Sequence, residues 1–214
     1  MHKVLVISFL LVFKALFASA QTDWKLSTEN DGIKIYTSMV PGSKIKALKV
    51  DCEFEATPSQ LVAVIMDIKN GTEWIYHTKS SVLIKQVSPS ELYYYSEVCL
   101  PWPAEDRDFV AHLKASQDPV TKVVTIDGPI ANNMVPVKNN IVRISDSNGK
   151  WVITPIGNDR IKVEYTLHAD PGGDLPAWII NMFATEGPMQ IFKNLKQQLQ
   201  KPAYKNVTLL FIAN

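Results

Sequence analysis

Short strand-like segments follow one another along most of this chain, and a single long helix closes it. Between Leu48 and Phe54 every second residue is apolar and every other one is charged, which is typical of a strand with one buried and one solvent-facing side. Residues 32–39 and 45–56, joined by the turn at Pro41 and Gly42, therefore predict a hairpin. Further strands are expected at residues 80–88, 91–99, 108–116, 122–126, 140–145, 150–156 and 160–169.

Helical spacing appears in two places. Residues 57–68 begin with Thr57, a good N-cap, and with Pro58 at a position where proline is tolerated. Residues 174–201 form the long closing helix, with Asp174 as its expected N-cap and with a kink or break at Gly187-Pro188, where proline removes a backbone donor. One apolar stripe runs along this helix: Leu175, Trp178, Ile179, Met182, Phe183, Met189, Phe192, Leu195 and Leu199.

These elements predict an α+β fold. The strands are mostly consecutive, which favours antiparallel pairing. A strongly curved antiparallel β-sheet wrapped around the long C-terminal α-helix buries every one-sided face, and such an arrangement leaves an internal hydrophobic cavity between the sheet and the helix.

Residues 1–20 have the pattern of a secretory signal peptide. A short positive region precedes an apolar run, Lys14 is a mild departure from that pattern, and Ala18-Ser19-Ala20 is a small-residue cleavage site. We therefore expect an exported, periplasmic or secreted protein, with one domain at 21–203 and an apolar tail at 204–214. Without the first twenty residues, 20 basic and 21 acidic residues remain, so no basic field exists to attract nucleic acid.

The mature chain has two cysteines, Cys52 and Cys99. Either a single disulfide or two buried free thiols fits an exported chain with so few cysteines.

Four segments resemble the steroidogenic acute regulatory protein-related lipid transfer (START) domain family, in an exported bacterial-type member. They are "LPWPAEDRDFV" at 100–110, "VPVKNNIVRI" at 135–144, "YTLHADPGGDLPAWIIN" at 165–181 and a tryptophan at Trp74. The resemblance runs from about Trp24 to Lys201. It implies a helix-grip fold with a tunnel for one hydrophobic ligand, closed by the helix at 174–201 and by the loop at 127–140.

Arg107 alternates with Phe109, Ala111 and Leu113, so we expect it on their buried face. Its guanidinium either faces a ligand headgroup inside the cavity or forms a structural ion pair with a nearby carboxylate, because an unpaired buried guanidinium is too costly. Some relatives carry a second inward arginine where this chain has Leu113, which puts a shared headgroup mechanism in doubt.

Glu97 is a candidate cavity acid that pairs with Arg107, or else a solvent-facing residue. Tyrosines 93–95 cover both faces of their strand, and a tyrosine in an apolar cavity supplies contact area and a hydroxyl. In the long loop, Ile130, Met134 and Val135 either cover the entrance and touch a membrane or anchor the loop. The candidate cavity-lining residues are Tyr95, Glu97, Arg107, Phe109, Leu113, Met134, Tyr165, Trp178, Met182, Phe183 and Phe192.

The sequence has no HExxH, CxxC, GxSxG or GxGxxG pattern, and its histidines are widely separated. We therefore expect no metal, no cofactor and no catalytic residue. The predicted protein is a monomer that binds a lipid or another hydrophobic small molecule, with possible transient membrane contact. The alternative is a helix-grip enzyme, of the cyclase or hydrolase type, acting on a hydrophobic substrate in the same cavity.

Overall fold

Ten strands form a single sheet in the computed structural model, which describes residues 23–43 and 45–214; the predicted signal peptide lies outside the described residues. The sheet order is β1-β2-β3-β10-β9-β7-β6-β5-β4, with every neighbouring pair antiparallel. The short strand β8 lies off this path and pairs with β6 in parallel. The strands are β1 (Lys25–Asn30), β2 (Ile33–Ser38), β3 (Ala47–Phe54), β4 (Thr78–Ser88), β5 (Glu91–Val98), β6 (Asp106–Gln117), β7 (Val124–Pro129), β8 (Ile141–Arg143), β9 (Asp146–Gly157) and β10 (Arg160–Asp170).

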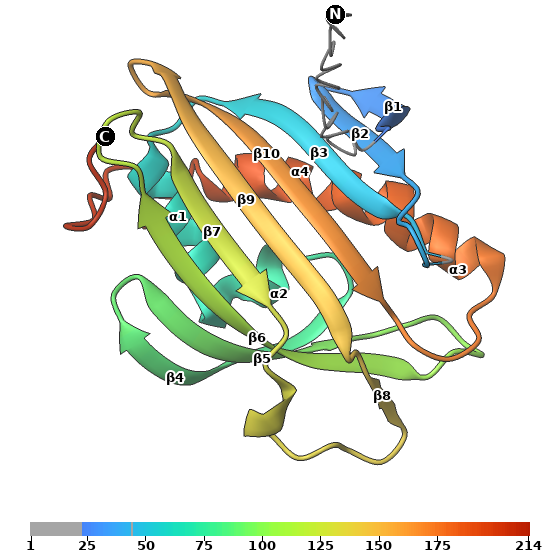
Figure 1. Ribbon diagram of the computed structural model, residues 1–214. Helices are drawn as coiled ribbons and strands as arrows, with labels where there is room; N and C mark the ends of the chain where they lie inside the picture. The colour runs from blue at the N-terminus through green and yellow to red at the C-terminus, as the bar shows by residue number, and fades with distance from the viewer. Residues whose placement is uncertain (1–22, 44) are drawn as a thin grey trace, which may run out of the picture.

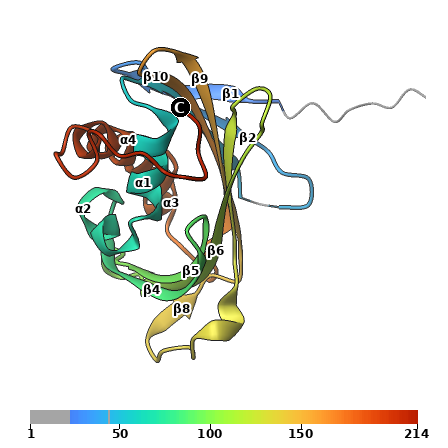
Figure 2. The same ribbon diagram turned by 90° about the vertical axis from the view of Figure 1, so that its left-hand side faces the viewer.

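The sheet is strongly curved, and α1, α2, α3 and α4 lie on its concave side (Figures 1 and 2). The curved antiparallel sheet with a C-terminal helix confirms the predicted fold class. The helical elements are α1 (Pro58–Met66), the 3₁₀ turn η1 (Ile68–Asn70), α2 (Gly71–Trp74), the 3₁₀ turn η2 (Asn132–Met134), α3 (Ala177–Asn181), the π-helical segment η3 (Met182–Glu186) and α4 (Gly187–Gln198).

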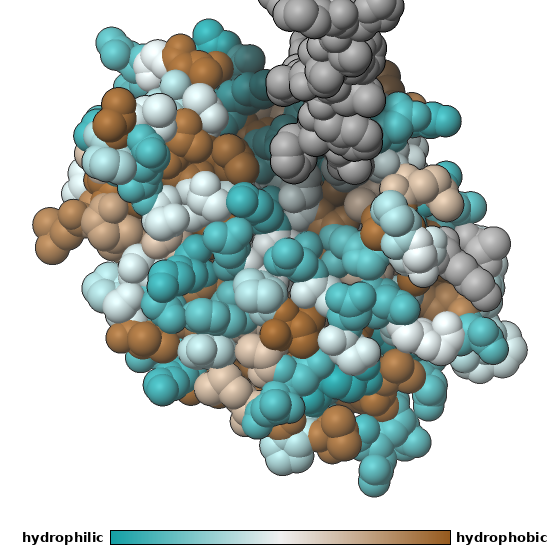
Figure 3. Space-filling view, viewed as in Figure 1, coloured by the Kyte–Doolittle hydropathy of each residue, from teal (hydrophilic) through white to brown (hydrophobic). Residues whose placement is uncertain are grey.

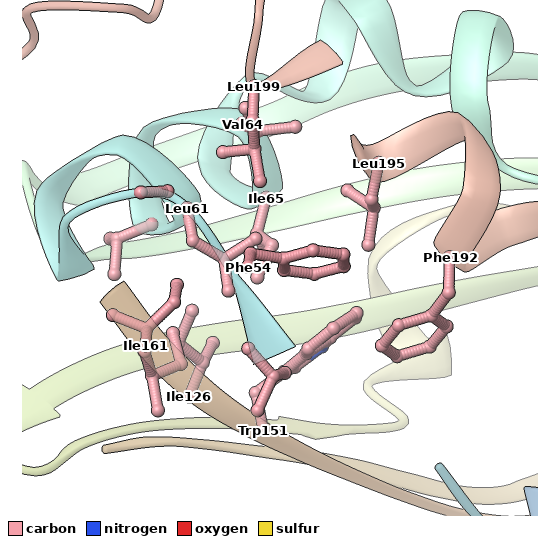
Figure 4. Packing of buried hydrophobic residues seen from close by; sticks show 14 of the residues in the cluster. Phe54, Leu61, Val64, Ile65, Ile126, Trp151, Ile161, Phe192, Leu195 and Leu199 are labelled. Atoms are coloured by element: carbon pink, nitrogen blue, oxygen red, sulfur yellow. The ribbon is translucent and has the colours of Figure 1, made fainter. Parts of the chain in front are cut away.

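The hydrophobic core fills the space between the sheet, α1 and α4 (Figure 4). Phe192 on α4 is its centre: the Phe192 ring centroid lies 5.5 Å from that of Trp151 and 6.3 Å from that of Phe54. Leu195 on α4 and Leu61 on α1 are also fully buried. On the outer face of the sheet, hydrophilic residues are interrupted by separate hydrophobic patches (Figure 3).

Helix α1 begins as the sequence predicts. The Thr57 hydroxyl accepts a hydrogen bond from the Gln60 backbone N–H, and the Gln60 side chain accepts one from the Thr57 N–H. This capping box satisfies two amide donors that a helix start otherwise leaves free. It fixes the start of α1, whose buried face includes Leu61 and Val62.

The C-terminal helix begins later than predicted. Its first residue is Ala177, it follows Pro176, and no side chain caps it, so the expected N-cap at Asp174 is wrong. The predicted irregularity at Gly187-Pro188 is present as a π-helical segment, in which the Gly187 N–H bonds to the Met182 carbonyl. Pro188 has no N–H to donate, and widening the preceding turn accommodates that loss.

The apolar C-terminal tail docks against α1 and the end of β6. Ile212 and Tyr204 are buried. The Ser59 N–H donates to Asn214 Oδ1 at 3.0 Å, and the Gln117 side chain both donates to and accepts from the Ala213 backbone at 2.8 Å. The tail is therefore part of the folded unit.

Both cysteines are free thiols, Cys52 buried and Cys99 exposed. Of the two alternatives that the sequence left open, the free thiols are present, but only one of the two is buried. Within residues 23–43 and 45–214 no helix has the length and hydropathy needed to cross a membrane.

Candidate functional site

The pairing of β5 with β6 decides which side chains face the helices. Tyr94 lies opposite Ala111, Leu92 opposite Leu113, and the latter pair belongs to the core. Successive side chains in a strand alternate between faces, and this pairing has no bulge, so Tyr95 and Glu97 point to the outer face. The prediction that Tyr95 and Glu97 line the interior is therefore wrong.

These two residues belong to a network of charges on the outer face. Asp108, which is fully buried, accepts hydrogen bonds from Arg143 Nε at 2.6 Å and from Arg143 Nη2 at 3.0 Å. The Tyr95 hydroxyl lies 3.1 Å from Asp108 Oδ2 and 3.2 Å from Glu97 Oε2. A two-pronged arginine–carboxylate pair of this kind fixes geometry as well as charge.

Glu97 is held as a carboxylate by two lysines. Lys79 Nζ lies 2.8 Å from one of its oxygens and Lys138 Nζ lies 3.0 Å from the other. These hydrogen bonds, to Lys79 first and then Lys138, lower the pKa of Glu97 to about 2. Glu97 therefore carries a negative charge at neutral pH and has no proton to give.

The same network pins the loop that was predicted to close the cavity. Arg143 donates to the carbonyl oxygens of Val135 and Pro136, each at 3.1 Å. Asn132 accepts from the Val110 N–H and donates to the Ile144 carbonyl at 2.7 Å. Met134 lies in this anchored loop and is partly exposed, so it does not face the interior.

Arg107 points inward as predicted, but its protein partners are not the expected carboxylates. It is only 4% exposed, and its guanidinium donates to the carbonyl oxygens of Glu105, Pro171 (2.9 Å) and Gly172 (2.8 Å). Backbone carbonyls thus stand in place of the expected carboxylate and satisfy the buried guanidinium without another charge. Burial lowers the pKa of Arg107.

The other predicted residues divide between the core, the inner surface and the exterior. Leu113 and Phe192 are fully packed core residues, whereas Phe109 and Tyr165 face inward and are half-buried. The Tyr165 ring lies 4.3 Å from that of Trp151 and 6.2 Å from that of Phe192. The structure therefore brings Tyr165 and Phe192 together.

The α3–η3 half of the C-terminal helix is packed more loosely than α4. Met182 and Phe183 are half-buried, and the Phe183 ring lies 5.8 Å from the rings of both Tyr76 and His77. Trp178, predicted to line the cavity, is 51% exposed, while its neighbour Ile179 is fully buried. Ile179 and not Trp178 therefore faces inward here, and the placement of Trp178 is also corrected.

Tyr94 is an inward-facing tyrosine that the sequence interpretation passed over in favour of Tyr95. It packs against the core and edge-on to Phe109, with ring centroids 5.8 Å apart. Burial raises the pKa of Tyr94 to about 12, and burial together with the nearby Tyr94 also raises the pKa of Tyr165. Both tyrosines remain half-buried rather than fully enclosed. The sequence held a signal for Tyr94. Ala111 lies on the same face of β6 as the inward-pointing Arg107, and Tyr94 is the residue of β5 that pairs with Ala111.

These inner side chains can bind an apolar molecule and offer it hydrogen bonds. Within the described part of the chain, no three histidine, cysteine or carboxylate residues are grouped to hold a metal ion. The carboxylates of Glu97 and Asp108, on β5 and β6, lie on the other face of the sheet and are already paired. The inner surface is therefore suited to binding.

Comparison with known proteins agrees with this geometry. The sequence matches the START domain family over residues 9–205. An uncharacterized protein of Pseudomonas aeruginosa is 31% identical over 185 residues, covering 84% of this chain and 88% of that protein. The phosphatidylcholine transfer protein of Mus musculus is 27% identical over 182 residues, covering 83% and 84%. The crystal structure of a STAR-related lipid transfer protein from Xanthomonas axonopodis superposes with a TM-score of 0.76 at 28% identity, covering 83% of this chain and 99% of that one.

Proposed function

Because this chain belongs to the START domain family, we propose that it binds one lipid between the sheet and the α3–η3 half of its C-terminal helix. One observation carries the proposal: Tyr94 and Tyr165 pack against the core from the inner face yet retain accessible surface. Apolar interiors are normally packed to the density of organic crystals. Inner side chains that stay accessible therefore favour a hollow that a ligand fills.

We infer that α3 and η3 are the segment that opens for the ligand. Phe192 and Leu195 hold α4 in the core, whereas Met182 and Phe183 are half-buried, and the π-helical turn separates the two halves. The loop at 127–140, predicted as a second gate, is anchored by Arg143 and Asn132. In this proposal that loop stays in place while the helix moves.

Lipid uptake requires contact with a membrane, and we propose that α3 makes it. Trp178 and Ile180 are 51% and 41% exposed on this short helix. Tryptophan is favoured at the boundary between water and lipid because its ring is apolar and its N–H is polar. Export by residues 1–20 then places the protein in the periplasm or outside the cell, where it carries or senses its lipid.

The proposed role is binding without chemistry. General acid–base catalysis needs a group whose pKa lies near the working pH. On the inner surface, burial moves the tyrosine pKa values upward and away from neutrality, and Arg107 is engaged by backbone carbonyls. These features favour a carrier over the alternative cyclase or hydrolase.

Native mass spectrometry of the purified mature protein tests this proposal. We expect a species heavier than the polypeptide by the mass of one lipid, and organic extraction should release that lipid unchanged. Incubation with vesicles and re-isolation should reload the emptied protein. A protein that carries no lipid and takes none from a broad panel contradicts lipid binding, and release of a chemically altered lipid favours the enzyme.

A further inference from the structure

Tyr94 and Tyr165 reach the interior from strands that are well separated in the sheet, β5 and β10. Tyr94 lies opposite Ala111 and Tyr165 opposite Val50, and both side chains are on the inner face. Burial raises the pKa of both, and no hydrogen bond to either hydroxyl contributes. Two neutral hydroxyls, each able to donate one hydrogen bond and accept others, are thus free inside an apolar space.

Further polar atoms on the inner side are also neutral and unpartnered. Within the described residues, Trp74 Nε1, Thr78 Oγ1 and Ser81 Oγ are buried without a hydrogen-bond partner. Thr78 and Ser81 lie opposite Val98 and Ser96, on the same face of the sheet as Tyr94. These three atoms have almost no accessible surface, so they lie beneath the lining rather than on it, and none of them carries a charge.

Charged groups are absent from the same surface, with one exception that is already occupied. In β3, β5, β6, β7, β9 and β10, all fully described, the register places only Arg107 among charged residues on the inner face. Its guanidinium donates to three backbone carbonyls, and the residue is only 4% exposed, so it presents almost no surface to a ligand. A phosphate or ammonium group brought against these strands therefore meets no accessible opposite charge, and burying an unpaired charge is strongly unfavourable.

From these contacts we propose that the ligand is a neutral lipid whose hydroxyl or carbonyl end is held by Tyr94 and Tyr165. The inference rests on the proposed lipid-binding function and adds the ligand class. The lining of Tyr94, Phe109, Tyr165 and Leu167 surrounds the apolar body, and the two hydroxyls orient the polar end. Phospholipids are excluded because their headgroups are charged, although a phosphatidylcholine transfer protein is among the relatives.

A competition between lipid classes tests the ligand class directly. Emptied mature protein is incubated with phosphatidylcholine vesicles that contain minor fractions of diacylglycerol, a long-chain alcohol and a sterol, then re-isolated and extracted. We expect one neutral lipid per protein and only background phosphatidylcholine, despite the excess of phosphatidylcholine. Recovery of phosphatidylcholine as the bound lipid overturns this inference but leaves lipid binding intact. Recovery of no lipid overturns lipid binding as well.

Removing the hydroxyl groups of Tyr94 and Tyr165 tests whether these two residues bind the polar end of the ligand. The double variant Tyr94→Phe with Tyr165→Phe keeps both rings, and loss of two neutral hydrogen bonds should weaken neutral-lipid binding about tenfold. Tyr93→Phe is the matched control, because Tyr93 stacks on His112 at 4.3 Å on the outer face. Equal affinity of the double variant and the wild type, with both folded by circular dichroism, overturns the assignment of these two residues.

Discussion

Arg107 Nη2 donates a hydrogen bond of 2.8 Å to the carbonyl oxygen of Gly172, although 65 residues separate the two in the chain. The bond joins the start of β6 to the turn that leads into α3. Gly172 and Gly173 both have positive φ, 67° and 65°, which glycine adopts without strain. Arg107 thus holds a turn that glycines make possible, directly before the helix segment proposed to open.

Arg107→Met should destabilise the protein by about 2 to 3 kcal/mol, because methionine keeps much of the buried volume but leaves buried carbonyls without donors. Urea unfolding of both proteins measures this difference. Hydrogen–deuterium exchange should also quicken in residues 170–186, and α1 should be unchanged. If exchange instead quickens uniformly across the chain, the hydrogen bonds of Arg107 do not stabilise this turn locally.

The sequence pattern predicted the curved sheet and its C-terminal helix more reliably than it predicted which side chains face the helix. Alternation correctly placed Arg107 with Phe109, because a strand repeats every two residues whatever surrounds it. The same argument failed for Glu97 because a loop covers the outer face here, so both faces of β5 and β6 are buried. Alternation of apolar and polar residues distinguishes faces only where one of them is wet.

Two other differences have causes outside local sequence. Strand β8 runs parallel to β6, and the Arg143–Asp108 pair that accompanies this register joins residues 35 positions apart. The π-helical segment between α3 and α4 shifts the phase of one half of the helix relative to the other, so a single 3.6-residue stripe drawn along 174–201 places Trp178 wrongly. The prediction was therefore weakest for the pairing of strands that are distant in the sequence and for the geometry of the C-terminal helix.

The contribution of Glu97 to the free energy of unfolding should depend on pH and be lost in acid. Its pKa is lowered from an ordinary 4.5 to about 2 in the folded protein, so its stabilising effect is complete above about pH 4.5 and is lost as the pH falls towards 2. Wild type should be more stable than Glu97→Gln at pH 7, and the gap in unfolding free energy should narrow between pH 5 and pH 3. Urea titrations at each pH measure it, and a gap that stays constant over that range counts against the two lysine contacts.

The two halves of the C-terminal helix should respond differently to truncation. Phe192→Ala removes a fully buried ring from the centre of the core and should cost about 3 to 5 kcal/mol. Phe183→Ala removes a half-buried ring and should cost about 1 to 2 kcal/mol. Thermal or urea unfolding compares them, with hydrogen exchange expected to be faster in residues 177–186 than in residues 188–198. Equal exchange in both halves argues against α3 and η3 as the moving segment.

Trp178→Ala tests membrane contact separately from folding. Because half of the Trp178 side chain is already in solvent, its loss should lower the free energy of unfolding by only about 1 kcal/mol, and the variant should stay folded. Lipid transfer between vesicles should nevertheless slow several-fold, since the variant loses an aromatic anchor at the membrane surface. Val120→Ala is the control: Val120 is 85% exposed in the turn between β6 and β7, at the opposite end of the molecule from α3 (Figure 1). Transfer that slows equally in both variants, or in neither, removes α3 as the membrane-contacting element.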